Sequence, residues 1–206
     1  MSLSKTALKN SAVSISEYAL KLLINFITVP IIIRSLGVDS FGIWRSILRA
    51  SEYFSLSDFR SSQTLKWLIA TKKDATIDEK QDWLSTCMFL LVLGILLILI
   101  VSAFLIYLDV IKFDENLTII FLIAICAQFI MSFANISLAI IQGTNNGYKR
   151  FLGIFFINIA VGISIIYFIK NDFGLEGLAI SLLFANFSYA IYFVFLSKKI
   201  EGKLIF

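Results

Sequence analysis

Residues 41–60, FGIWRSILRASEYFSLSDFR, are apolar enough for a membrane helix, yet they carry two guanidinium groups and a carboxylate. Arg45, Arg49 and Glu52 recur at the spacing of successive helical turns, so a helix would place them on one face. Each Arg centred in a membrane helix costs roughly 2.5 to 3.5 kcal/mol on insertion scales, whereas each large apolar residue returns only about 0.3 to 0.6 kcal/mol. We therefore expect this face to turn away from lipid, toward a hydrated space between helices.

The rest of the chain has the composition of an integral membrane protein. Its 206 residues are 59% hydrophobic and 16% charged, with a mean hydropathy of +0.89. A helix needs about 20 apolar residues to cross a bilayer. The stretches that meet or approach this length are 11–33, 41–66, 85–108, 117–141, 151–169 and 175–197. They predict an all-α fold, an integral membrane bundle of six transmembrane helices that forms a single domain over residues 1–206.

Basic residues in the connections predict the orientation of this bundle. One side would hold Lys5, Lys9, Lys66, Lys72, Lys73, Lys80, Lys149, Arg150, Lys198, Lys199 and Lys203. The other side would hold Arg34, Lys112 and Lys170. Because Lys and Arg concentrate in cytoplasmic connections, we expect both the N-terminus and the C-terminus to be cytoplasmic.

The composition also argues against several classes of protein. The chain has no His and two Cys, and neither cysteine stands at a metal-ligand spacing. We therefore expect no metal site, no cofactor and no His-based catalytic triad. No cluster of Ser, Cys or carboxylates offers a nucleophile and a base, so an enzyme is not expected. The net charge of +4 is assigned to membrane orientation, and no nucleic-acid partner is expected.

Polar side chains recur at helical spacing in three predicted spans. On the second span Arg45, Arg49, Glu52 and Gln63 share a sector of about 60°, with Arg60 at its margin. The stripe on the first span is Asn10, Ser14, Glu17, Lys21, Asn25 and Thr28. The stripe on the fourth span is Gln128, Ser132, Asn135 and Gln142. For the fourth span, hydrogen bonding between helices is an open alternative to a cavity lining.

These stripes predict a cationic vestibule. Glu17 with Lys21, and Arg49 with Glu52, have the i, i+4 and i, i+3 spacings of ion pairs, which lower the cost of burial. The polar faces of the first and second spans keep an excess of positive charge, which would attract an anion such as a lipid-linked phosphate. Arginine is suited to this role because it binds phosphate through two parallel hydrogen bonds. The candidate residues are Lys21, Arg45, Arg49 and Arg60 for substrate binding, Glu17 and Glu52 for charge tuning or ion coupling, and Asn25, Gln63, Gln128 and Asn135 as cavity lining. Pro30 is expected to kink the first span.

Several segments in order resemble a known family. They are Pro30 with IIIRSLGVDSFGIWRSILRASEYFSLSDFRSS (31–62), containing Arg34, Leu36, Gly37, Phe41, Gly42 and Trp44, then IIQGTNNGYKRF (140–151) and FGLEGLAIS (173–181). Together they resemble the polysaccharide or O-antigen flippases of the multidrug/oligosaccharidyl-lipid/polysaccharide exporter superfamily, over essentially the whole chain. The resemblance implies a multi-pass protein of the bacterial plasma (inner) membrane. Its expected activity is the transfer of undecaprenyl-pyrophosphate-linked oligosaccharide to the periplasmic leaflet for cell-surface polysaccharide biosynthesis.

The chain departs from the family in two respects. DFRSS (58–62) stands where members often have an acidic-leucine-glycine stretch. The family also has about twelve or more helices in two halves that rock against each other, and this chain resembles the N-terminal six-helix half. Two copies could associate, a separate chain could supply the other half, or the product could be incomplete. Two other functions stay open: a cation-coupled small-molecule exporter of the same superfamily, or a noncatalytic membrane scaffold.

Overall fold

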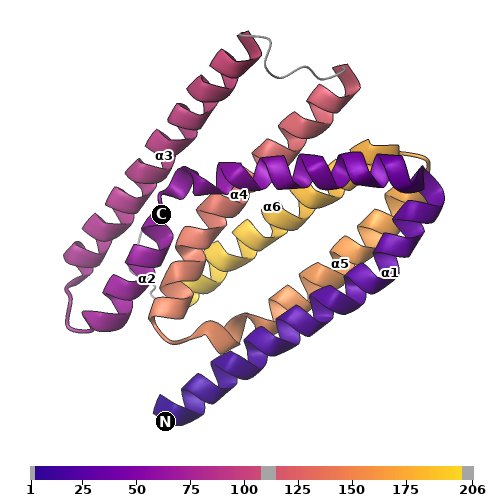
Figure 1. Ribbon diagram of the computed structural model, residues 1–206. Coiled ribbons are helices and arrows are strands. Elements are labelled where there is room, and N and C mark those ends of the chain that lie inside the picture. Colours follow the sequence, from indigo (N-terminus) through magenta and orange to yellow (C-terminus); the bar gives the residue numbers. More distant parts are fainter. Residues whose placement is uncertain (1–2, 108–114, 201–206) are drawn as a thin grey trace.

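The computed structural model describes residues 3–107 and 115–200 and shows only helices there, with no strand (Figure 1). The α-helices are α1 (Leu3–Glu52), α2 (Ser61–Thr71), α3 (Ile77–Tyr107), α4 (Glu115–Gly143), α5 (Phe151–Lys170) and α6 (Gly174–Ile200), with short 3-10 helices η1 (Tyr53–Asp58) and η2 (Gly147–Arg150). Within these ranges five helices, all except α2, are long and apolar enough to cross a membrane. The all-helical class and the apolar character of the helices are therefore confirmed.

The first helix, α1, consists of two limbs joined at Gly37. Gly37 has φ 84° and ψ 163°, a backbone conformation that is essentially restricted to glycine. Figure 1 shows limb 3–36 running along one side of the molecule and limb 38–52 returning across it from the bend. The predicted turn between the first two spans is thus found at Gly37. Pro30 lies within the first limb with helical φ and ψ, and the reversal of the chain is at Gly37.

The prediction of one continuous second span over 41–66 is wrong. The second limb of α1 ends at Glu52, η1 follows, and Phe59 and Arg60 adopt positive φ of 46° and 58°. The buried carboxylate of Asp58 stabilises this break, because it accepts hydrogen bonds from the Arg60 N–H at 2.8 Å and the Ser62 hydroxyl at 2.6 Å. Helical periodicity therefore does not carry across the break into α2.

The four later predicted spans match α3, α4, α5 and α6. The third begins earlier than expected, at Ile77, where Thr76 and Glu79 form a reciprocal cap: the Thr76 N–H donates to Glu79 at 2.8 Å and the Glu79 N–H donates to Thr76 at 3.3 Å. This arrangement satisfies backbone donors at the start of α3. Residue 108, at which the third span was predicted to end, lies outside the described residues, as do Lys112 and Lys203.

Helix α4 is the centre of the packing. On one side its Ile136 joins Leu65 of α2 and Leu91 of α3 in a buried cluster. Farther along, its Ala124 packs with Trp44 of the second α1 limb and Leu178 of α6. A third cluster joins α4 to α5 and α6. Its buried members are Ala134, Ile141, Ile154, Ala185, Tyr189, Phe193 and Leu196. The core thus fixes the positions of α5 and α6, against which the two limbs of α1 lie.

By contrast, α1 lies at the periphery of the bundle. Only 11% of its most apolar window is buried, against 39% for α6. Its first limb exposes large apolar side chains such as Phe26, which is 80% accessible. In a membrane such side chains are compatible with lipid contact. Lipid contact does not explain the polar face of the same limb.

Candidate functional site: a cationic cleft between α1, α5 and α6

A cleft lies between the two limbs of α1 and the paired helices α5 and α6. It consists of two adjoining cavities of about 210 and 230 Å³ that share Asn25 of α1, Val161 and Ile165 of α5, and Leu182 and Ala185 of α6. Lys21 lines one cavity and Arg45 lines the other. We call the combined space the cationic cleft.

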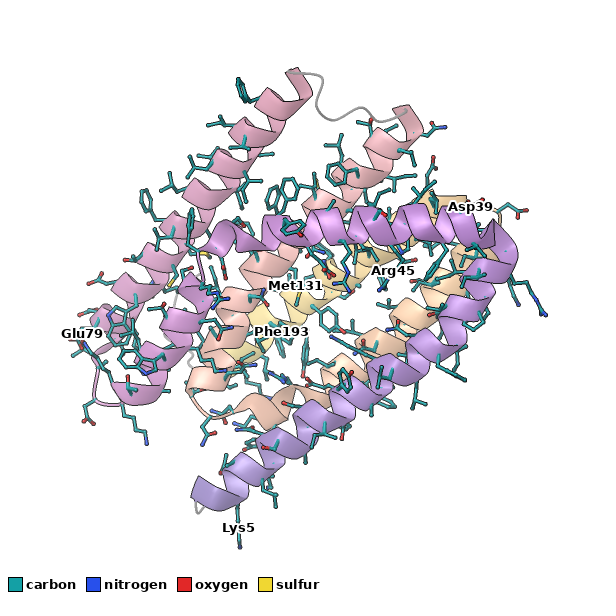
Figure 2. All side chains as sticks on the ribbon, viewed as in Figure 1. Lys5, Asp39, Arg45, Glu79, Met131 and Phe193 are labelled. Carbon is teal, nitrogen blue, oxygen red and sulfur yellow. The ribbon has the colours of Figure 1, made fainter. Side chains whose placement is uncertain are left out.

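The reversal at Gly37 places residues from both limbs around this cleft. Trp44 is 6% exposed and packs with Ile32 and Leu178 in the core, which fixes the rotation of the second limb. Arg45, the next residue, is about 100° farther round the helix. Figure 2 shows the Arg45 side chain pointing into the angle between the two limbs. The sequence prediction that this arginine turns inward therefore agrees with the structure.

Positive charge dominates the cationic cleft. None of the described residues that line it is acidic. Within residues 3–107 and 115–200, neither Lys21 nor Arg45 forms an ion pair or a hydrogen bond. Both side chains are accessible to solvent. An uncompensated cation in a membrane-spanning segment requires water, a counter-ion or an anionic ligand, so the cleft is suited to receive an anion.

The predicted pairing of Glu17 with Lys21 is wrong. Glu17 instead accepts two hydrogen bonds from Arg150 at the end of η2: Nε to Oε1 at 2.8 Å, and Nη2 to Oε2 at 2.9 Å. Ser14 also accepts from Arg150 Nη2, at 3.4 Å. Because Arg150 forms a two-point contact with the carboxylate, Lys21 is left without that counter-charge. Glu17 acts here as a link between α1 and η2.

Sequence reasoning treated Arg150 only as a basic residue of a connection. The only signal that could have identified it was the polar face of the first limb, which required a partner from elsewhere in the bundle. Spacing within one helix favoured Lys21, and spacing says nothing about contacts between residues so far apart in sequence.

Arg49 and Glu52 form the predicted ion pair, but not inside the cationic cleft. Arg49 Nη1 donates to Glu52 Oε2 at 2.8 Å, and the two side chains are 68% and 52% exposed. Neither is among the residues that line the cleft. Arg49 therefore has a counter-charge beside it, unlike Arg45 one turn earlier.

Arg60 and Gln63 are separated from Arg45 by the break in the second span. Arg60 precedes α2 with a left-handed φ of 58°, and Gln63 lies in the first turn of α2. Both side chains are exposed, and neither lines the cationic cleft. The predicted common face with Arg45 and Arg49 is wrong because that face required a continuous helix.

Gln128 and Asn135 of α4 are half-buried and do not line the cationic cleft either. Asn158 of α5 and Asn186 of α6 line the cleft instead. The Asn186 side-chain amide donates to the Ala127 carbonyl of α4 at 2.8 Å. Asn186 thus joins two helices and also contributes to the wall of the cleft. Isolated in its span, it gave no periodic signal in the sequence.

Comparison with known proteins gives no family model, no curated protein and no solved structure that matches the chain. In the described residues no group of three or more His, Cys, Asp or Glu side chains is placed to hold a metal ion. Fold and site alone therefore define the class. Over residues 3–107 and 115–200 the protein is helical, and five of its helices are long and apolar enough for a multi-pass membrane protein. A lysine and an arginine without an ion-pair partner in those ranges line a cleft between α1, α5 and α6.

Proposed function

We propose that this chain is a six-span unit of a bacterial plasma-membrane flippase for a lipid-linked oligosaccharide. Its substrate would be an undecaprenyl-pyrophosphate-linked glycan destined for cell-surface polysaccharide or O-antigen. The observation that carries the proposal is the pair of cations, Lys21 and Arg45, that line one cleft and, among the described residues, have neither an ion-pair partner nor an acidic neighbour in the lining. The family resemblance of segments 31–62, 140–151 and 173–181 supports it independently.

In this proposal the two limbs of α1 belong to two separate membrane crossings. Limb 3–36 has 34 residues, about 51 Å of helix, which is longer than the roughly 30 Å hydrocarbon layer. Limb 38–52 provides only about 22 Å, so η1 and α2 complete the second crossing. The basic connections support cytoplasmic N- and C-termini.

The chemistry of the two cations fits a pyrophosphate. A guanidinium binds two phosphate oxygens at once, and the ammonium of Lys21 serves as a point charge for a third. The amides of Asn25, Asn158 and Asn186 border the same space and can exchange hydrogen bonds with sugar hydroxyls. No bond is formed or broken. The role of the site is to replace part of the hydration of the anion.

The open side of the cleft requires a partner. Alternating access proceeds by one helical bundle rocking against another around a site near the middle of the membrane. A second six-helix unit, from further sequence, another chain or a second copy, would cover α1, the least buried of the spanning helices. The ligand would then be enclosed between the two units.

Export of surface glycan in cells with a complete, working transporter tests the proposal. Arg45→Ala and Lys21→Ala should each abolish export while the amount of protein in the membrane stays normal. The matched control is Arg49→Ala, which removes a guanidinium one turn away that is already paired with Glu52 and should leave most export intact. Full export in both cleft variants would reject the proposal and favour a scaffold, with a co-purifying partner protein as its sign.

A further inference from the structure

A second polar cavity lies at another place in the bundle, beside the start of α1. It has a volume of about 450 Å³ and lies between α1, α2, the end of α4 and η2. Its polar lining consists of Asn10, Ser11, Ser14, Lys66, Gln142 and Arg150. We call it the η2 cavity. None of these residues lines the cationic cleft.

In the η2 cavity, hydrogen-bond donors without a partner among the described residues outnumber acceptors without one. The Lys66 ammonium and the Gln142 amide have no side-chain partner among the described residues. The Nε and Nη2 groups of Arg150 bind Glu17 and Ser14, which leaves its Nη1 group without a partner in residues 3–107 and 115–200. Asn10 uses its amide oxygen to accept from the Tyr148 N–H at 2.7 Å. The free groups are therefore mainly donors.

The electrostatic balance of the η2 cavity also favours an anion. The charge of Arg150 is offset by Glu17 in a largely buried pair, and no described lining residue is acidic. Lys66, a half-buried residue, is left as a net positive charge. Lys9 lies nearby, with its Nζ 5.5 Å from the centre of the Tyr148 ring of η2. Phosphate oxygens accept several hydrogen bonds and carry the complementary charge.

The backbone around the η2 cavity is held in place without any ligand. Asn10 binds both Tyr148 and Asn145, the latter through its amide group at 2.7 Å. The Glu17–Arg150 pair provides a second connection between α1 and η2. These contacts fix the α1 and η2 walls of the cavity, so a ligand would meet the Arg150 guanidinium already ordered and would lose less affinity to the ordering of that side chain.

We propose that the η2 cavity binds a phosphate group, with Lys66 as the principal cation and Gln142 and Arg150 Nη1 as additional donors. Two sources share this chemistry: the phosphomonoester headgroup of an anionic lipid, and phosphate free in solution. The inference does not depend on the proposed transport activity, because its residues are separate from Lys21 and Arg45.

The test uses the whole 206-residue chain with two probes, each in its own membrane mimetic. Inorganic phosphate is titrated by calorimetry against protein in phosphatidylcholine discs, and dioleoyl phosphatidic acid is titrated into detergent-solubilised protein by native mass spectrometry. Lys66→Gln should weaken binding by about tenfold or more, the usual consequence of losing a charge-assisted hydrogen bond, and Lys66→Arg should retain it. Gln142→Ala should weaken it less. The matched control is Lys73→Gln, which removes an exposed lysine from the turn that follows α2.

Each outcome decides the question. Binding of phosphatidic acid alone identifies a lipid headgroup, and binding of inorganic phosphate identifies a solution ligand; both support the site if Lys66→Gln reduces binding and Lys73→Gln does not. Equal losses in the two variants would mean diffuse attraction to basic surface residues and would overturn the proposal. So would the absence of binding by the unaltered protein to either probe. The two proposals can fail separately. If phosphate does not bind in the η2 cavity, glycan export by the unaltered protein is still expected. If the Lys21 and Arg45 variants lose export, phosphate binding at Lys66 should remain intact.

Discussion

Glu17 and Arg150 form a largely buried two-point ion pair that joins the first limb of α1 to the start of α5. The Nε–Oε1 and Nη2–Oε2 distances are 2.8 and 2.9 Å, and the side chains of Arg150 and Glu17 are 9% and 15% exposed. Both partners are withdrawn from solvent, so each depends on the other to offset its desolvation. This contact fixes the first limb of α1 relative to α5 and η2.

Glu17→Gln should therefore destabilise the protein strongly, because it leaves a buried guanidinium without a counter-charge. Removing one partner of a buried pair typically costs about 3 to 5 kcal/mol. Thermal unfolding in detergent, followed by helical circular dichroism, should show a clearly lower midpoint. The double variant Glu17→Gln/Arg150→Met should recover much of the loss, since no charge then remains buried. Independent, additive effects of the two substitutions would contradict the pairing.

Gly37→Ala should disrupt the reversal of α1. A side chain at φ 84° and ψ 163° costs on the order of 1 to 3 kcal/mol, although a Cβ there would meet no atom within 4 Å. The penalty is thus purely conformational. Gly42→Ala is the matched control, since this residue is helical and equally uncrowded, and it should stabilise by roughly 0.5 to 1 kcal/mol. Unfolding midpoints that move in the same direction for both variants would argue against the bend at Gly37.

Gly94→Ala should loosen the contact between α3 and η1. A Cβ at Gly94 would overlap the backbone carbonyl of Ser57, which cannot move aside as a side chain can. Overpacking of this kind costs typically about 1 to 3 kcal/mol. Gly153→Ala is a useful comparison, because there the added methyl meets the ring of Tyr192, which can shift. Unfolding experiments should show a greater loss for Gly94→Ala, and an equal or smaller loss would place α3 farther from η1 than the structure has it.

The orientation can be tested with single cysteines in a variant lacking Cys87 and Cys126. Asp39 lies beside the bend of α1 and Lys5 near its opposite end, as Figure 2 shows. The positive-inside rule predicts that Asp39→Cys and Asp172→Cys react with a membrane-impermeant thiol reagent in intact cells. Lys5→Cys should react only after the membrane is permeabilised. The reverse pattern would place the termini on the other side of the membrane.

Most of the helical architecture could be predicted from hydropathy, because apolar runs as long as 151–169 are typical of membrane helices and not of helices in soluble proteins. The break after Glu52 could not be predicted, since it depends on hydrogen bonds of the Asp58 carboxylate and on a close approach of Gly94 in another helix. Periodicity extended through that break and wrongly aligned Arg60 with Arg45. Local sequence patterns do not reveal where tertiary contacts interrupt a helix.

The candidate site was predictable only in part, for a similar reason. Lys21, Asn25 and Arg45 were identified because an ionisable or polar residue in a span needs a polar environment. The partner of Glu17 was missed because it comes from a connection 133 residues away. Asn158 and Asn186 were missed as lining residues because each is isolated in its own span. Contacts between elements distant in sequence decided which polar residues meet.

The proposed function requires Lys21 and Arg45 to form an anion site at the cationic cleft. The most direct measurement is the affinity of the purified protein, in phosphatidylcholine nanodiscs, for a polyprenyl pyrophosphate. Arg45→Gln and Lys21→Gln should each weaken binding by about tenfold or more, while Arg49→Gln stays close to the unaltered protein. Unchanged affinity in both cleft variants, or an equal loss in Arg49→Gln, would contradict the account.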